Sequence, residues 1–202
     1  MPLTNRSLIS SAHQSGLYGN SLINRIHPAW NFVAYLHELN RSTQESCNLL
    51  EPCGVEMVYV SRFTSHKQIS IHVPLGQRLP MYCTSAGRAF LSALPESEAA
   101  SRIARSSLVR HTPGTDIDPA SLAAVIRQAH RDGFALSNEE YYVGDIAVGA
   151  PIVNGDGQPL GAINISVPFS RWALKEVIAE LAPQVVNAAR TISNAAQGLR
   201  PI

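Results

Sequence analysis

The sequence has few of the features that mark disulfide-rich, secreted or membrane-spanning proteins. Its three cysteines, Cys47, Cys53 and Cys83, form no CxxC pair, so neither a disulfide framework nor a zinc ribbon is indicated. No apolar run approaches the roughly 18 residues of a membrane span. The N-terminus also lacks the apolar core of a signal peptide. We therefore expect a soluble cytoplasmic protein with no membrane partner.

The chain also lacks an excess of positive or negative charge. Sixteen Lys and Arg residues against fifteen Asp and Glu residues give a net charge of +1. DNA-binding domains usually carry a basic patch or stripe, and no Lys/Arg run occurs here. With 45% apolar and 15% charged residues, the composition is typical of a globular domain. Any contact with nucleic acid is therefore expected to lie outside this chain.

Motifs for catalysis and metal binding are missing too. The chain has no G-x-S-x-G, P-loop or H-E-x-x-H sequence, and its seven histidines include no pair at i, i+4 spacing. Glu139, Glu140 and Asp145 could form an acid–base cluster, although carboxylates beside a strand end are more often turn and surface groups. Neither Cys83 nor Ser85 has an evident base. We expect no catalytic residues, no metal and no cofactor.

Hydrophobic periodicity predicts a mixture of helices and strands. Helices are expected to begin near Pro28, Thr84, residue 96, Asp118 and Leu174. Strands are expected over residues 47–50, 55–60, 68–73, 134–138, 146–153 and 160–167. This order is typical of an α+β domain with an antiparallel sheet and differs from a βαβ nucleotide-binding sheet.

Turn and cap residues sharpen this prediction. Asp118 followed by Pro119 predicts a helix start, and Gly133 predicts its end. The segments 51–54 and 154–157 have turn composition and predict two hairpins. Pro183 should kink or split the last helix.

The segment from Leu79 to Arg88 is the first candidate binding site. Small residues at a predicted helix start leave backbone N–H groups accessible, and the helix dipole favours an anion there. The alternative is that Ala86 and Gly87 only allow the helix to pack closely on the sheet.

Asn164 and Ser166 form the second candidate, because strand alternation places them on one face of an apolar strand. Buried polar groups need hydrogen-bond partners. Either a ligand or a neighbouring backbone group would satisfy them.

Several motifs in the same order resemble the C-terminal effector-binding domain of IclR-type bacterial transcription regulators. Residues 76–92, GQRLPMYCTSAGRAFLS, follow the family pattern G-x-R-L-P-x-[HY]-A-[ST]-x-x-G-[KR]-x-[LI]-L-A closely. Further matches lie at residues 112–122, at 133–144, and at 149–166, which ends in Gly161-Ala162-Ile163-Asn164-Ile165-Ser166. The resemblance covers roughly residues 28–195.

The resemblance implies a fold and an organisation. The expected fold is a GAF-like or profilin-like α+β domain, with a curved antiparallel sheet flanked by helices. Residues 1–26 would be an arm left from the interdomain linker helix, residues 27–197 the effector-binding domain, and residues 198–202 a tail. The expected partners are a small organic acid and further copies of the chain, in a dimer or tetramer. Operator DNA would be contacted only through a winged helix-turn-helix domain that is missing here.

The resemblance also implies a pocket on one face of the sheet. Its expected effector-binding residues are Ile69, Ile71, Leu79, Met81, Ser85, Ala86, Gly87, Ser137, Asp145, Ala147, Val148, Asn164 and Ser166. The effector carboxylate would bind the N–H groups of residues 85–87. Relatives that bind small 2-oxo acids have Asp, Cys and Ser at the positions of Ser137, Ala147 and Asn164, which argues against a small oxo acid. Tyr82, Phe90 and the less polar walls fit a larger, aromatic carboxylate, and the Met81-Tyr82 pair resembles the aromatic-catabolism branch of the family.

Three alternatives remain open at this point. The chain could be an enzyme on a similar fold, which a base beside Cys83 or Ser85 would support. The chain could be a GAF-like sensor module of another signalling protein. It could also be an assembly-only domain whose pocket is collapsed and takes no ligand.

Overall fold

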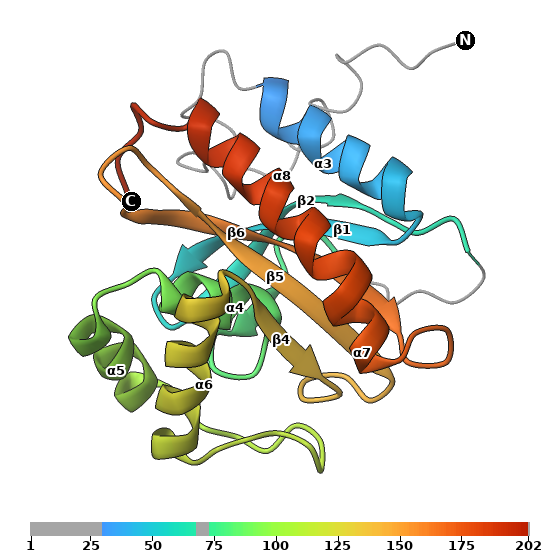
Figure 1. Cartoon of the computed structure of the whole chain (residues 1–202). Helices are drawn as coiled ribbons and strands as arrows, with labels where there is room; N and C mark the ends of the chain where they lie inside the picture. Colours follow the sequence, from blue (N-terminus) through green and yellow to red (C-terminus); the bar gives the residue numbers. More distant parts are fainter. Residues whose placement is uncertain (1–29, 68–72, 202) are drawn as a thin grey trace, which may run out of the picture.

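The computed structural model describes residues 30–67 and 73–201 of the chain (Figure 1). Its centre is a curved six-stranded sheet of order β3-β2-β1-β6-β5-β4, in which every neighbouring pair is antiparallel. The strands are β1 (Ser46–Cys53), β2 (Glu56–Phe63), β3 (Arg78–Pro80), β4 (Ala135–Asn138), β5 (Asp145–Val153) and β6 (Pro159–Pro168). The predicted α+β fold with a curved antiparallel sheet is confirmed.

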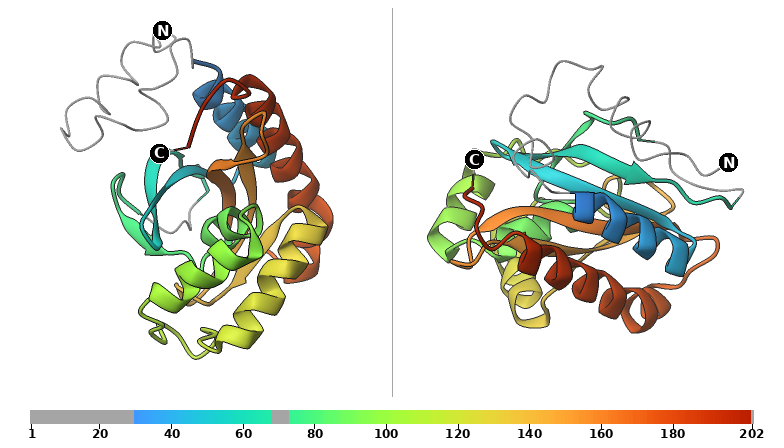
Figure 2. Two further views of the ribbon diagram at one scale, coloured as in Figure 1. Left: turned by 90° about the vertical axis from the view of Figure 1, so that its left-hand side faces the viewer. Right: turned by 90° about the horizontal axis from the view of Figure 1, so that it is seen from above.

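Helices cover both faces of this sheet (Figures 1 and 2). One face carries α3 (Trp30–Thr43) and the C-terminal helix α8 (Ala182–Ala195), which pack against each other. The other face carries α4 (Ser85–Ser92), with α5 (Glu96–Arg105) and α6 (Pro119–Asp132) outside it. The sheet therefore separates two hydrophobic cores.

Strand alternation decides which core each side chain enters. In β5, Ile146, Val148 and Ile152 belong to the core beneath α3 and α8. Gly149, between them, faces the start of α4, where a Cβ atom would come within 2.9 Å of the Ser85 carbonyl. Period-two alternation thus gives the sheet one continuous apolar face and one face that can carry a site.

The predicted helix caps are confirmed. The Asp118 side chain accepts a hydrogen bond from Ser121 N (2.9 Å), and Gly133 ends α6 with φ of 76°. Thr84 caps α4 by accepting from Gly87 N (3.3 Å). Side-chain oxygens at these positions satisfy N–H groups that the first turn of a helix cannot bond internally.

The last helix is interrupted as Pro183 predicted. A short α7 (Leu174–Glu176) runs into a π-helical turn, Val177–Leu181, before α8 begins with the proline in its first turn. A proline ring clashes with the carbonyl four residues earlier, so the helix widens immediately before it.

The prediction for the first hairpin needs a correction. The proposed turn, residues 51–54, is too long and starts too early, because β1 continues through Pro52 to Cys53 and the turn comprises only Gly54 and Val55. Pro52 is tolerated in the strand because β6 pairs with β1 only as far as Leu50.

One strand of the structure, the three-residue β3, was not predicted from the sequence. The expected arm at residues 1–26 lies outside the described residues, and so does most of the expected strand 68–73. Within the described ranges, no helix is long and apolar enough to cross a membrane.

Substitution of Gly87 by alanine should destabilise the fold. A Cβ atom at this position would lie 2.3 Å from Met81 Cα and 2.4 Å from the Met81 carbonyl oxygen, so backbone would have to move. Overpacking of this kind costs about 1–3 kcal/mol in the free energy of unfolding, measurable by urea denaturation. Gly198→Ala is the control, since a Cβ there meets nothing within 4 Å. Equal stability of the two variants would contradict the close packing of α4 described here.

Candidate functional site

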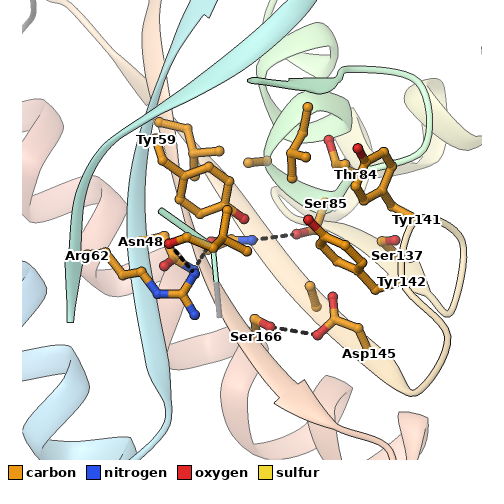
Figure 3. Close-up of a pocket in the computed structure, with 16 residues that line it drawn as sticks. Asn48, Tyr59, Arg62, Thr84, Ser85, Ser137, Tyr141, Tyr142, Asp145 and Ser166 are labelled. Atoms are coloured by element: carbon orange, nitrogen blue, oxygen red, sulfur yellow. Dashed lines mark hydrogen bonds between the residues drawn. The ribbon is translucent and has the colours of Figure 1, made fainter. Parts of the chain in front are cut away.

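A polar hollow lies between the concave face of the sheet and the N-terminus of α4 (Figure 3). Its cavity has a volume of about 20 Å³, which is room for little more than one water molecule. The lining residues come from all six strands, from the start of α4, from the β4–β5 turn and from the segment before β3. They are Asn48, Leu50, Tyr59, Arg62, Val73, Leu79, Thr84, Ser85, Ala86, Ser137, Tyr141, Tyr142, Asp145, Ala147, Asn164 and Ser166.

Strand register places the polar side chains in a row across the floor of this hollow. Arg62 on β2 is paired with Asn48 on β1, and Asn48 is paired with Asn164 on β6. Gly149 on β5 continues the row, opposite Asn164. Directly paired residues of adjacent strands point to the same face, so the three polar side chains lie together.

A β-bulge brings Tyr59 into the same hollow as Arg62. The two residues are three apart on β2, and regular alternation would send them to opposite faces. The register between β1 and β2 shifts between Leu49 and Leu50, so that Leu50 pairs with Tyr59 while Asn48 pairs with Arg62. The extra residue of the bulge re-aims the strand, and both side chains line the hollow.

The start of α4 presents backbone N–H groups to the hollow. The N–H of Gly87 donates to Thr84 Oγ1, whereas those of Ser85 and Ala86 have no hydrogen-bond acceptor among the described residues. Gly149 lets this turn approach the sheet closely, because a Cβ atom there would come within 3.1 Å of Ala86 N. Free N–H groups at a helix N-terminus favour an anion.

Two buried amides link the helix start to the strands. Asn48 Nδ2 donates to Asn164 Oδ1 (2.8 Å), and Asn164 Nδ2 donates to Ser85 Oγ (3.2 Å). The Asn48 side-chain oxygen, in a residue with no exposed surface, has no hydrogen-bond partner. A buried carbonyl oxygen without a donor is unusual and points to a missing partner.

Asp145 supplies a carboxyl group at the edge of the hollow. Ser166 Oγ donates to its Oδ1 (2.6 Å), as Figure 3 shows. Burial raises the pKa of Asp145 to about 6, although the Ser166 hydrogen bond and the Arg62 charge both lower it. Burial also lowers the pKa of Arg62 from its usual value. The hollow therefore holds one cation and one carboxyl that titrates near neutrality.

A buried ion pair holds the β4–β5 turn over the hollow. The Arg88 guanidinium donates to both carboxylate oxygens of Glu140, and these side chains are only 4% and 12% exposed. Arg88 also donates to the backbone oxygens of Tyr82 (2.7 Å) and Leu136 (3.0 Å). The turn that carries Tyr141 and Tyr142 is thus tied to α4.

The suspected acid–base cluster of Glu139, Glu140 and Asp145 does not form. Glu140 pairs with Arg88, Glu139 accepts from Gly144 N (2.8 Å), and Asp145 lies in the hollow. The expectation that such carboxylates are surface groups is wrong for Glu140. Burial raises the pKa of the Cys83 thiol to about 12, which leaves it a neutral thiol at physiological pH.

The structure brings together eight of the thirteen residues expected to bind an effector. They are Leu79, Ser85, Ala86, Ser137, Asp145, Ala147, Asn164 and Ser166. Ile69 and Ile71 lie outside the described residues.

The other three expected residues do not line the hollow. Val148 points into the opposite core, because it is one residue out of phase with Ala147. Met81 is buried in the core around α4, and Gly87 packs on its backbone. The expectation that Gly87 N–H is available to a carboxylate is corrected, since Thr84 occupies it. The alternative role of Gly87, close packing of the helix, is the one observed.

Sequence reasoning missed much of the polar lining. Asn48, Tyr59 and Arg62 were not considered, and neither were Tyr141 and Tyr142. Asn48 alternates correctly between Cys47 and Leu49, so its position was available from the pattern. The placement of Tyr59 beside Arg62 depends on the bulge, which the pattern does not show.

A second hollow, of about 470 Å³, lies among α4, α5 and α6. Its walls are mainly apolar, with Leu91, Ile103 and Ile126 among them, and its rim includes the Arg127–Glu96 ion pair (3.0 Å). None of the buried side-chain atoms found without a partner in the described ranges belongs to it. In the described part of the chain, no group of three His, Cys, Asp or Glu residues could hold a metal ion.

The described residues thus combine a curved antiparallel sheet with a polar hollow against a helix N-terminus. The family profile described as bacterial transcriptional regulator IclR C-terminal matches residues 22–194. The chain therefore belongs to the IclR family of transcriptional regulators and corresponds to its effector-binding domain.

Individual relatives agree with this assignment. The Pca regulon regulatory protein of Pseudomonas putida is 31% identical over 159 residues, covering 78% of this chain and 55% of the relative. The acetate operon repressor of Salmonella typhimurium is 28% identical over 188 residues, covering 92% and 66%. The chain thus spans about half to two thirds of the length of these curated relatives, which are transcriptional regulators and not enzymes.

A solved structure is similar over most of its length. The inducer-binding domain of the PobR transcription factor from Acinetobacter, a double mutant in complex with 3-hydroxybenzoic acid, superposes with a TM-score of 0.73 and 26% identity. The match covers 80% of this chain and 95% of that domain.

Asp145 should make stability depend on pH. Its pKa in the folded state, about 6, exceeds the ordinary 3.8, so the folded state binds the proton more tightly and stability falls as pH rises from about 4 to 6. The free energy of unfolding should decrease between pH 4 and pH 7 in the wild type, and it should decrease less in Asp145→Asn. The two decreases should differ by up to about 3 kcal/mol. Urea denaturation at each pH measures this, with the exposed Asp132→Asn as control. Parallel profiles for wild type and Asp145→Asn would refute the burial of this carboxyl.

Proposed function

We propose that the chain senses a small organic acid, with an aromatic carboxylate as the favoured class, in the hollow between α4 and the sheet. The observation that carries the proposal is the pair of unoccupied N–H groups at Ser85 and Ala86, which face a hollow that also contains Arg62. An N-terminal helix turn and a guanidinium both favour a carboxylate. The effector carboxylate would accept hydrogen bonds from the two N–H groups.

The size of the cavity implies that the effector must open it. About 20 Å³ does not admit an aromatic acid, so side chains have to move aside on binding. Tyr141 and Tyr142 are the candidates, because they lie on a turn and are only partly buried. Since the ion pair between Arg88 and Glu140 joins this turn to α4, movement of the turn would also shift α4.

Displacement of Tyr141 and Tyr142 would give the domain two conformations, closed and open, and the effector would bind the open one. A ligand shifts an equilibrium only through its different affinities for two states. Regulation needs a coupling of about 1–3 kcal/mol between effector and DNA sites. We propose that assembly of the chain as a dimer or tetramer transmits the change to a DNA-binding domain outside these residues. Val143 and Phe169, two exposed apolar residues whose segments are joined by the hydrogen bond from Phe169 N to the Gly144 carbonyl, are available for self-association.

The relative bound to 3-hydroxybenzoic acid supports an aromatic acid as the effector class. That ligand belongs to the PobR domain, and the likeness to this chain extends over 80% of its residues. The Pca regulon regulatory protein supports the role in transcription rather than the identity of the ligand.

A thermal-shift screen with Ala86→Leu tests the site. The panel runs from pyruvate and glyoxylate to hydroxybenzoates and phthalates. At 100 times its dissociation constant, an effector adds about 2.7 kcal/mol of stability, which is several degrees in melting temperature. Ala86→Leu fills the hollow at the helix start and should abolish the shift, because Ala86 lines the cavity and is 1% exposed.

Ala100→Leu is the matched control, since it places the same side chain in the second hollow. It should leave the shift unchanged. If Ala100→Leu removes the shift and Ala86→Leu keeps it, the effector binds between α4, α5 and α6 instead. No shift with any acid would favour a domain that only assembles.

A further inference from the structure

The unpartnered oxygen of Asn48 specifies a property of the effector that its carboxylate does not. Asn48 lies at the floor of the hollow with no exposed surface. Its amide N–H₂ is used, because it donates to Asn164 Oδ1 at 2.8 Å. Its Oδ1 accepts no hydrogen bond in the described part of the chain.

No side chain of the described residues donates a hydrogen bond to Asn48 Oδ1. Asn164 turns its own N–H₂ away, toward Ser85 Oγ at 3.2 Å. Arg62, which is paired with Asn48 in the sheet, donates from Nη1 to the Val73 carbonyl oxygen at 3.2 Å, and its buried Nε makes no hydrogen bond to Asn48 Oδ1. Both side-chain amides therefore donate toward the start of α4, Asn48 to Asn164 and Asn164 to Ser85. The Asn48 oxygen, at the other end of this chain of hydrogen bonds, is left as an acceptor.

This acceptor lies two hydrogen bonds from the helix start, along the relay Asn48–Asn164–Ser85. A ligand whose carboxylate lies at Ser85 and Ala86 would extend its body along this relay toward Asn48. A carbonyl or ether oxygen there would face another acceptor, whereas an O–H group would complete the hydrogen bonding of Asn48.

We propose that Asn48 selects effectors that carry a hydroxyl group in addition to the carboxylate, so that the site takes hydroxy acids in preference to the corresponding ethers or unsubstituted acids. The inference rests on the proposed function of the hollow as an acid site. It assigns Asn48 as a specificity-determining residue, with the side-chain oxygen as the reader of the hydroxyl.

Asp145 does not duplicate this role. One of its carboxyl oxygens already accepts from Ser166 Oγ at 2.6 Å. Its protonation changes with pH, whereas an amide oxygen is an acceptor at every pH. Selection of the hydroxyl by Asn48 should therefore persist from pH 5 to pH 8, even where the overall affinity for the acid changes.

Isothermal titration with acids that differ in one group tests the proposal. The probes are 3- and 4-hydroxybenzoate, the matching methoxybenzoates and benzoate, with 3-hydroxybutyrate, 3-methoxybutyrate and butyrate as an aliphatic series. Methoxy acids keep the oxygen and lose the donor. The wild-type chain should bind the best hydroxy acid at least about tenfold more tightly than its methoxy partner, which corresponds to about 1.4 kcal/mol.

Variants assign the preference to Asn48. In Asn48→Leu the ratio of the two affinities should fall to near one, through weaker binding of the hydroxy acid. Asn48→Asp keeps an acceptor oxygen and should keep the preference, but it should bind every acid more weakly, because it loses the donor to Asn164 Oδ1 and adds a negative charge. Ser92→Ala is the control outside this hollow, since that buried hydroxyl likewise donates to a backbone carbonyl, that of Ala89 (2.8 Å), and it should leave the ratio unchanged. Circular dichroism checks that each variant is folded.

The outcomes separate the inference from the function on which it rests. If acids bind without preferring the hydroxyl, the role of Asn48 is overturned and the acid site stands. A preference that survives in Asn48→Leu overturns Asn48 as the reader. If Asn48→Leu does not fold, Asn48→Ala removes the same acceptor with a smaller side chain and is measured in its place, with the same expected loss of preference. Failure of every acid to bind overturns the proposed function itself.

Discussion

The close approach of α4 to the sheet is the constraint on which the rest of the structure depends. Gly149 and Gly87 make it possible, because a Cβ atom at either position would overlap backbone of the facing segment. The approach brings the first turn of α4 onto the polar row of β1 and β6, so that Ser85 Oγ can accept from Asn164. A helix held farther away would leave the Asn164 N–H₂ buried without its acceptor, Ser85 Oγ. The close approach at Gly87 and Gly149 therefore determines both how α4 packs on the sheet and where the polar hollow forms.

The charges of the hollow follow from the same arrangement. Arg62 and the N-terminus of α4 make it favourable for an anion, while Asp145 opposes an anion unless its carboxyl is protonated. Burial places that protonation near pH 6, within the range where small changes alter the balance. The ion pair between Arg88 and Glu140 then connects the cover of the hollow to the helix beneath it. Hydrogen bonds and packed backbone thus connect the cover of the hollow, the start of α4 and the sheet.

The sequence predicts most of the fold because its signals are local. The cap at Asp118 and the interruption at Pro183 are each fixed by one or two residues, and both were found. The site is harder to predict from the sequence, because its geometry depends on the register between strands. Alternation placed Asn164 and Ser166 on the polar face, yet Val148 was assigned to the same face although it is out of phase with Ala147. Arg62 could not have been placed beside Tyr59 without the bulge, which arises from the pairing of two strands.

A crystal structure of the chain with its tightest-binding acid tests the central claim most directly. The account predicts the carboxylate within hydrogen-bond distance of the Ser85 and Ala86 N–H groups, with Tyr141 and Tyr142 displaced from their present positions. The larger hollow between α4, α5 and α6 should be empty in that complex. Electron density for the acid in the larger hollow, with the polar row of the sheet unchanged, would contradict the account.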